Sequence, residues 1–284
     1  MIETKVQLPR FDLQISGIQN FEGDRPEVIA LHGWLDNCHS FKSLLSEMNE
    51  QKILAIDLPG HGRSDHHLPS QISHFHDYIF FIAELLKSLD LDRCHLIGHS
   101  MGGAIASLYA ACFPDRVRSL ALIESIGPLS LAEDEAPSRM AQAVESWLRN
   151  GGRTNPYYDD LDAAIQTRQK SGNLSYEIAK TLTVRGTRAT PDGIQWTHDP
   201  RLKLPSARLY SEPQVQAYLK SIECPTLFIR GNNTFLSNAA LVEQRLEMVK
   251  QLSQITVSGG HHLHMESPGE LAKIIGQFLD VGHL

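Results

Sequence analysis

The sequence has no long apolar run and no surplus of positive charge, and both absences exclude classes of function. Its 284 residues include 26 Lys and Arg against 33 Asp and Glu, a formal net charge of -7. Binding to nucleic acid or to an anionic membrane draws on clustered Lys and Arg, which this chain lacks. The apolar run at Tyr78–Ala83 is far too short to span a bilayer. We expect a small-molecule substrate, with no nucleic-acid and no membrane partner.

Cysteine is also scarce, and its spacing excludes two kinds of scaffold. The four cysteines lie far apart, and none forms a C-x-x-C pair: Cys38, Cys94, Cys112 and Cys224. Neither a zinc site nor a disulfide framework is indicated. The N-terminal stretch MIETKVQLPR is charged from its third residue and lacks the apolar segment of a signal peptide. These features predict a cytoplasmic protein with reduced thiols, and they leave its oligomeric state open.

Short apolar runs alternate with helical patterns along most of the chain. The runs EVIALHG (27–33), KILAIDLPG (52–60) and VRSLALIES (117–125) have the length and composition of buried strands. Apolar side chains at helical spacing occupy residues 75–89, between two such runs. Buried strands that alternate with helices predict an α/β fold, a mostly parallel sheet flanked on both faces by helices.

The sequence pattern changes after residue 127. Residues 128–220 read as acidic, Gly- and Pro-bearing helical pieces with no convincing strand, and the alternation returns at CPTLFIRG (224–231). We therefore predict one core domain, formed by residues 1–127 and 221–284. The segment 128–220 is predicted to be a helical insertion in this core.

The stretch GHSMGG (98–103) carries one serine between glycines, where strand-like sequence gives way to helix-like sequence. It contains G-x-S-x-G, the nucleophile-elbow pattern, in the strand-to-helix context that the motif requires. A turn that tight forces the serine into an uncommon backbone conformation, and glycine neighbours let the backbone approach without Cβ clashes. Ser100 is predicted to present its hydroxyl at a strand end, with the N–H of Met101 aimed at a developing oxyanion.

Two other segments offer the groups that such a serine needs. LHGW (31–34) ends an earlier strand and supplies a second backbone N–H, that of Trp34, for an oxyanion hole of two donors. GGHHLHMESP (259–268) places His261 just after the last predicted strand. A base there could reach Ser100 from a neighbouring loop.

Taken in order and approximate spacing, LHGW, DLPGHGRSD, GHSMGG and GGHHLHMESP resemble the α/β-hydrolase family over most of the chain. HGWLDN (32–37) and RGTRATPDGIQWTHDPRL (185–202) are similar, more narrowly, to the serine hydrolase-like group. The resemblance implies an α/β-hydrolase fold with Ser100 as nucleophile and His261 as base. It also implies that residues 128–220 form the cap, or lid, of that family.

The acid of the implied triad departs from the family's commonest pattern. The usual position, three residues beyond the glycine that ends the penultimate strand, holds Thr234, which cannot stabilise an imidazolium by charge. The alternative family position, the end of the strand after the nucleophile helix, holds Glu124. Glu124 is therefore predicted to be the acid, and a plain strand-end carboxylate is the competing interpretation. Asp199 and Asp57 are the next candidates.

The predicted function is hydrolysis of an ester, thioester or activated amide through a Ser100-Glu124-His261 triad and an acyl-enzyme. No cofactor and no metal is expected. Asp36, Trp147 and Trp196 are predicted to touch the substrate, although turn or core roles compete for each. Two alternatives stay open: hydrolysis of a carbon-carbon bond by the same triad, and a catalytically silent ligand-binding protein.

Overall fold

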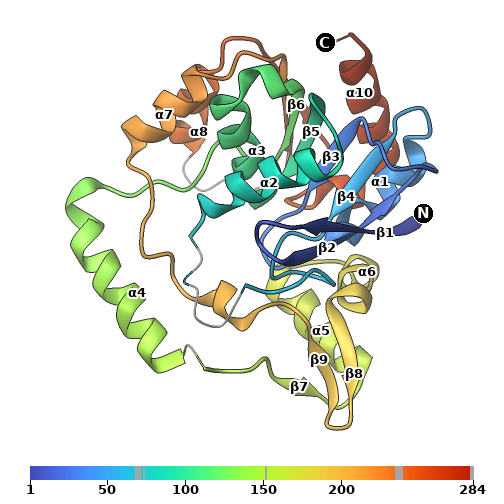
Figure 1. Ribbon diagram of the computed structural model, residues 1–284, viewed down its shortest axis with the longest axis vertical. Coiled ribbons are helices and arrows are strands. Elements are labelled where there is room, and N and C mark those ends of the chain that lie inside the picture. Colours follow the sequence, from blue (N-terminus) through green and yellow to red (C-terminus); the bar gives the residue numbers. More distant parts are fainter. Residues whose placement is uncertain (68–71, 73, 151, 234–238, 282–284) are drawn as a thin grey trace.

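The computed structural model describes residues 1–67, 72, 74–150, 152–233 and 239–281. Within this part of the chain, one sheet has eight strands in the order β1-β2-β4-β3-β5-β6-β10-β11 (Figure 1). The strands from β4 to β11 are parallel to one another. Strand β2 pairs antiparallel with β4, and β1 pairs antiparallel with β2. The strands are β1 Ile2–Leu8, β2 Leu13–Gln19, β3 Val28–Leu31, β4 Ile53–Ile56, β5 Cys94–His99, β6 Val117–Ile123, β10 Thr226–Gly231 and β11 Leu252–Val257.

Helices cover both faces of this sheet and enclose two apolar cores. One core contains Leu85, Ile105 and Val215, from helices on one face, and the other contains Leu44 and Phe278, from helices on the opposite face. The α/β-hydrolase fold predicted from the sequence is confirmed. The helices are α1 Lys42–Glu47, α2 Asp77–Ser88, α3 Met101–Cys112, α7 Glu212–Lys220, α8 Ala239–Leu246, α9 Leu263–Glu266 and α10 Pro268–Val281, and the short 3-10 helices are η1 Cys38–Phe41 and η2 Pro114–Arg116.

The central strands are apolar along their whole length because both faces of the sheet are covered. Every residue of β3 and of β4 is buried. Parallel pairing sets Leu31 of β3 opposite Gly98 of β5, and His99 of β5 opposite Ile123 of β6. The loops that follow these strands therefore leave the sheet at one edge, side by side. None of the helices formed by the described residues has both the length and the apolarity that crossing a membrane requires.

The inserted segment, residues 128–220, is not built from helices alone. Its helices are α4 Ala136–Asn150, α5 Leu161–Gly172, α6 Tyr176–Gly186 and α7, with 3-10 turns η3 Glu133–Glu135 and η4 Pro200–Lys203. It also forms a small antiparallel sheet in the order β7-β9-β8, with β7 Tyr157–Tyr158, β8 Thr187–Thr190 and β9 Gly193–Trp196 (Figure 1). The expectation of a segment without strands was wrong. At two to four residues, the strands are too short to show an alternating apolar pattern.

Turn chemistry explains the hairpin that the pattern missed. The turn between β8 and β9 contains Pro191, Asp192 and Gly193, and Gly193 has a φ of 121°. A Cβ at Gly193 would overlap the carbonyl oxygen of Tyr158 in β7. Glycine at this point therefore permits both the turn and the close approach of the third strand.

A buried ion pair attaches the inserted segment to the sheet. Arg185 of α6, fully buried, donates from Nε to Asp57 (2.9 Å) and from Nη1 to Glu3 of β1 (2.7 Å). Asp57 follows β4 and also accepts from the backbone N–H groups of Cys38 (2.7 Å) and Arg63 (2.8 Å). Although burial opposes it, Arg185 holds the pKa of Asp57 below its ordinary value. At the other end of the segment, α7 packs against the core through Val215.

We predict that the protein loses stability on mild acidification, in part through His61. This side chain is fully buried, and burial lowers its pKa from 6.5 to about 3. In the unfolded chain His61 takes up a proton near pH 6.5, whereas in the folded chain it stays neutral down to about pH 3. The free energy of unfolding therefore falls as the pH drops from 6.5 toward 3. For His61 alone the loss is about 2 kcal/mol by pH 5.

Urea unfolding at pH 7.5 and at pH 5 measures this loss. In His61→Gln the difference between the two pH values should shrink by about 2 kcal/mol relative to the parent. The control is His76→Gln, at a side chain that is 46% exposed, which should keep the parental difference. An unchanged difference in His61→Gln would contradict the assignment of the buried histidine as a neutral group.

Candidate functional site

The turn from β5 into α3 holds Ser100 in a strained conformation. Its φ is 50° and its ψ is -117°, a region that non-glycine residues seldom adopt. A Cβ at Gly98 would lie 2.5 Å from the Cα of Gly103, and a Cβ at Gly102 would overlap the carbonyl oxygen of Leu31. The glycines around Ser100 are therefore required by close backbone approach. The turn leaves the side chain of Ser100 partly exposed at the carboxyl edge of the sheet.

The same edge brings Glu124 to His261. Glu124 directly follows β6 with a φ of 56°, and its side chain is fully buried. Its Oε1 accepts a hydrogen bond from the N–H of Gly231 at 2.6 Å, and its Oε2 lies 3.5 Å from Nδ1 of His261. The imidazole of His261 is 47% exposed. Glu124 can hold the ring in place and stabilise its protonated form, although the 3.5 Å contact is long for a hydrogen bond.

The other carboxylates considered for the acid have other partners. Asp57 binds Arg185, and Asp199 accepts from Arg201 at 2.6–3.0 Å. Thr234 lies outside the described residues. In the part of the chain that the structure describes, Glu124 is the carboxylate that contacts the imidazole of His261.

The hydroxyl of Ser100 and the ring of His261 are not hydrogen-bonded to each other among the described residues. The backbone carbonyl of His261 does have a partner near Ser100, because Nε2 of His99 donates to it at 2.8 Å. His99 is the residue that precedes Ser100. The elbow and the histidine loop are thus tied together by a neighbouring side chain, and in free hydrolases such catalytic hydrogen bonds often tighten only when substrate binds.

The two predicted oxyanion donors lie on adjacent loops. Trp34 follows β3 and Met101 begins α3, and the packing of Gly102 on Leu31 brings these two points together. Within the described chain, neither backbone N–H donates to a protein acceptor. The indole of Trp34 is anchored separately, by its Nε1 donating to the carbonyl of Leu202 at 3.0 Å. Two N–H groups near Ser100 are therefore available to a ligand oxygen.

Behind the elbow lies a buried group of four side chains, Asp36, His99, His262 and His264. Asp36 Oδ2 accepts from Nε2 of His262 at 3.0 Å, and Asp36 Oδ1 accepts from Arg168 at 2.5 Å. The rings of His99 and His264 pack with centroids 4.2 Å apart, and burial holds the pKa of each well below its ordinary value. Asp36 was predicted to touch substrate, and the structure places it in this group at 3% exposure.

The atoms of Asp36, His99 and His262 that could bind a metal lie within 4.8 Å of one another. A divalent ion there would have to displace the hydrogen bond from His262 to Asp36 and compete with the guanidinium of Arg168. The carboxylate of Asp36 thus already binds a cation and a hydrogen-bond donor. The buried Nδ1 of His99 has no hydrogen-bond partner among the described residues.

The two predicted tryptophans lie apart from each other. Trp196 of β9 is 9% exposed, and its ring packs on Gly186 of α6. Trp147 of α4 is 47% exposed, and Figure 1 shows α4 at the margin of the molecule, away from the main sheet. Among the described residues, the ring of His261 contacts those of His99 and His262 and neither tryptophan.

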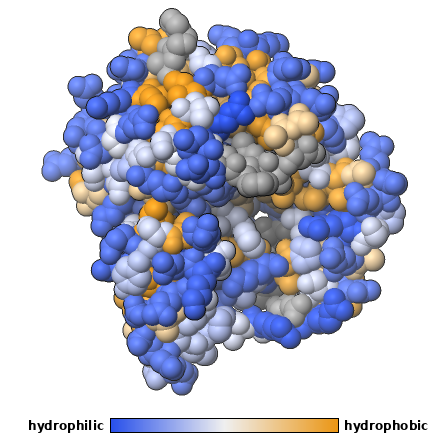
Figure 2. Space-filling model, turned by 180° about the vertical axis from the view of Figure 1, so that it is seen from behind, coloured by the Kyte–Doolittle hydropathy of each residue, from blue (hydrophilic) through white to orange (hydrophobic). Residues whose placement is uncertain are grey.

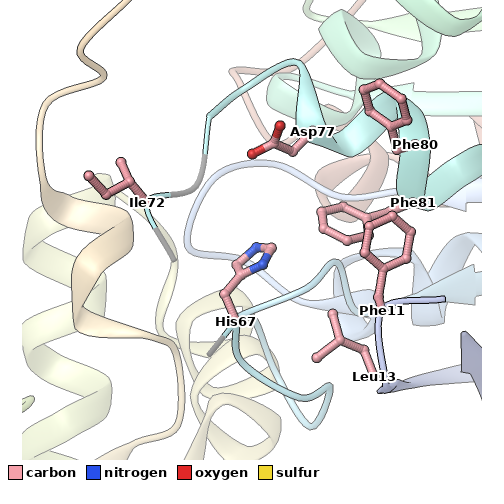
Figure 3. A pocket seen from close by; sticks show the side chains of 7 residues that line it. All are labelled: Phe11, Leu13, His67, Ile72, Asp77, Phe80 and Phe81. Atoms are coloured by element: carbon pink, nitrogen blue, oxygen red, sulfur yellow. The ribbon is translucent and has the colours of Figure 1, made fainter. Parts of the chain in front are cut away.

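Two surface hollows are separate from this edge of the sheet. One, of about 240 Å³, is lined by seven residues that Figure 3 shows facing it: Phe11, Leu13, His67, Ile72, Asp77, Phe80 and Phe81. The second, of about 290 Å³, lies between α2, α3 and the two tyrosines Tyr210 and Tyr218. Neither includes Ser100 or His261. Figure 2 shows that apolar side chains on the rear face gather in separate groups among hydrophilic ones.

Sequence reasoning missed part of this site. His99 occupies the variable position before the serine of G-x-S-x-G. A titratable side chain at that position was the feature of the sequence that could have identified it as part of the site. His262 and His264 follow the predicted base and are buried, at 7% and 0% exposure. Arg168 had no signal, because nothing in its helical neighbourhood distinguishes it from a surface arginine.

Comparison with known proteins identifies the family. The sequence model of the α/β-hydrolase fold matches residues 26–268. The chain belongs to the α/β-hydrolase family. This α/β-hydrolase is 32% identical over 272 residues to a probable serine hydrolase of Drosophila melanogaster. The aligned region covers 90% of this chain and 81% of that protein.

Two further relatives agree. A serine hydrolase-like protein of Dictyostelium discoideum is 31% identical over 271 residues, 89% of this chain and 74% of that one. The crystal structure of a hypothetical protein from Pseudomonas aeruginosa PAO1 superposes with a TM-score of 0.92 at 30% identity, over 99% of this chain and 100% of that one. The resemblance of this α/β-hydrolase to the serine hydrolase-like group is confirmed.

We predict that Gly102→Ala destabilises the protein by about 3 kcal/mol, because the added methyl group overlaps the backbone carbonyl of Leu31. The matched control is Gly276→Ala in α10, where the new Cβ would meet only the Gln51 side chain at 3.7 Å. That variant should be as stable as the parent or gain about 0.5–1 kcal/mol from helix propensity. Thermal unfolding compares them, and equal behaviour of both variants would refute the close approach at the elbow.

Proposed function

We propose that this α/β-hydrolase is a serine hydrolase that cleaves an ester, thioester or activated amide of a small molecule through an acyl-enzyme on Ser100. The observation that carries the proposal is the pairing of a strained, partly exposed Ser100 with the contact of Glu124 and His261 at the same sheet edge. Strain of this kind persists only where the surrounding structure enforces it.

The proposed acylation step uses His261 as the base. Its Nε2 takes the proton of the Ser100 hydroxyl as the oxygen attacks the substrate carbonyl, and the imidazolium then gives that proton to the leaving group. Glu124 lies on the Nδ1 side, where a carboxylate fixes the tautomer and stabilises the positive charge. In the second half, His261 activates a water that hydrolyses the acyl-enzyme and returns the proton to Ser100.

The proposed oxyanion hole consists of the N–H groups of Trp34 and Met101. Both donors come from backbone held by the packing of α3 against β3, so little reorganisation is needed as charge develops on the carbonyl oxygen. We also propose that the inserted segment is the cap that covers the substrate. Of the predicted contacts, Trp196 fits a wall of the cap, and the half-exposed indole of Trp34 binds the inserted segment at the carbonyl of Leu202.

One observation favours a second candidate, a ligand-binding protein without turnover. The contact of Glu124 with His261 is long at 3.5 Å, and His261 does not bind the Ser100 hydroxyl among the described residues. Hydrolysis of a carbon-carbon bond would use the same residues and differ only in substrate. A fluorophosphonate probe separates a serine hydrolase from a ligand-binding protein without turnover. It modifies an activated serine at one equivalent and leaves an inactive serine unlabelled.

The chemistry of the cysteines supports a reducing compartment. All four are free, and Cys38, Cys94 and Cys224 are buried. Burial raises the pKa of the Cys94 thiol to about 12, which keeps it protonated and unreactive. We propose a cytoplasmic location on this ground.

Ser100→Ala is expected to abolish fluorophosphonate labelling and to lower turnover of p-nitrophenyl esters by about 10⁴-fold or more, because no other activated oxygen lies at the elbow. A panel of esters of increasing chain length supplies the substrates. Circular dichroism should match the parent. A folded Ser100→Ala protein that keeps its esterase rate would remove Ser100 from the mechanism.

Glu124→Gln is expected to lower kcat by about 10⁴-fold, because the amide removes the charge that stabilises the imidazolium. The substitution keeps an oxygen that can accept from Gly231, so the fold should survive. Glu223→Gln, at an exposed carboxylate between α7 and β10, is the matched control and should keep the parental rate. A Glu124→Gln enzyme within threefold of the parent would show that the acid lies elsewhere.

A further inference from the structure

Asp36 connects three parts of the molecule that the proposed chemistry uses together. Its Oδ2 accepts from Nε2 of His262 at 3.0 Å, and its Oδ1 accepts from Nη2 of Arg168 at 2.5 Å. Asp36 itself belongs to the tight turn after β3, in which its N–H donates to the carbonyl of Gly33 at 3.2 Å. The turn includes Trp34, the proposed oxyanion donor. All of these side chains except Trp34 are largely enclosed, with Asp36 at 2%, His262 at 9% and Arg168 at 16% side-chain exposure.

The contact with His262 bears on the neighbouring base. His262 directly follows His261, so a bond that fixes the ring of His262 also fixes the backbone on one side of His261. The carbonyl of His261, in the peptide bond that joins it to His262, also accepts from Nε2 of His99. The backbone that follows His261 is therefore held by two side chains, His262 and His99.

The contact with Arg168 bears on the inserted segment. Arg168 lies in α5, and the amide of Asn37, next to Asp36, donates to the carbonyl of Leu182 in α6 at 2.9 Å. Figure 1 shows α5 and α6 below the main sheet, beside the loops that leave it. Two polar contacts thus dock these helices on the turn that contains Trp34 and Asp36.

The two partners also keep Asp36 charged. Burial alone would raise the pKa of this carboxyl, but His262 and Arg168 outweigh it and hold the pKa well below the usual range. A buried carboxylate that loses one partner is left with an uncompensated charge, and the surrounding groups must rearrange. Removal of Arg168 should therefore be felt at His262 and at the loop of His261.

We propose that Asp36 is a positioning residue that couples the docking of α5, through Arg168, to the placement of the His261 loop and of the Trp34 oxyanion donor. The inference rests on the proposed serine hydrolase function and deepens it, because it makes the inserted segment part of the catalytic geometry. A direct contact of Asp36 with substrate does not fit, since both carboxylate oxygens are occupied and the side chain is enclosed.

The test compares Asp36→Asn, Arg168→Gln and the double variant by steady-state kinetics on a p-nitrophenyl ester and by the rate of fluorophosphonate labelling. We expect each single variant to lower kcat and the labelling rate by 10- to 100-fold while KM stays within threefold, because alignment and not substrate affinity is lost. The kcat of the double variant should lie within about threefold of that of the slower single variant, because the two substitutions remove the same coupling.

Arg168→Lys retains the charge and should recover most of the rate lost in Arg168→Gln. Arg139→Gln is the control, because Arg139 makes a hydrogen bond within the inserted segment, to the carbonyl of Ser206 at 2.8 Å, and does not contact Asp36. It should keep the parental kcat. If Asp36→Asn does not fold, the Arg168→Gln and Arg168→Lys pair decides the question alone.

Any of the following results would overturn the inference. A rise in KM at constant kcat would make Asp36 or Arg168 a substrate contact, and losses that multiply in the double variant would show that the two act separately. Failure of Arg168→Lys to restore the rate would remove the role of the charge. If the parent itself takes no fluorophosphonate at Ser100, the proposed function fails and the positioning role falls with it, whereas a labelled parent with unaffected variants refutes the positioning role alone.

Discussion

The close approach of α3 to the end of β3 is the constraint on which the rest of the site depends. The backbone of Gly102 packs so tightly on the carbonyl of Leu31 that no side chain fits between them. This contact forces the turn at Ser100 into its strained conformation and sets Met101 beside the loop of Trp34. The proposed nucleophile and the proposed oxyanion donors are therefore placed by one packing contact.

Parallel pairing extends this placement to the acid and the base. Because β3, β5, β6 and β10 run in the same direction, the residues that follow them emerge at one edge of the sheet. Glu124 reaches Gly231 at the end of β10 by a 2.6 Å hydrogen bond, and this bond aims its second oxygen at His261. The sheet thus brings residues that are far apart in the chain together as neighbours.

Local patterns were sufficient to predict the sheet and the elbow, since each follows from a strand and its end. The contact of Glu124 with His261 was expected only from the resemblance to the α/β-hydrolase family. Local patterns were insufficient for features decided across the fold. Arg168 and Asp36 are 132 residues apart, and His262 and Asp36 are 226 apart, so no spacing rule links them. The strands of the small sheet failed for a different reason, because two to four residues leave no period to detect.

The inserted segment is attached to the core by buried charge as well as by apolar packing of α7, and the charged contacts have a consequence for catalysis. The stabilisation from apolar packing is roughly proportional to the buried area, so it tolerates small shifts of the packed elements. The hydrogen bonds of Arg185 with Asp57 and of Arg168 with Asp36 form at one geometry only. Losing either alignment leaves a buried carboxylate without its cation, at a cost of about 3–5 kcal/mol for a fully buried pair. Helices α5 and α6 therefore have a defined position relative to the loops after β3 and β4. A segment docked in this way can shape the substrate site and hold the catalytic loops with the same contacts.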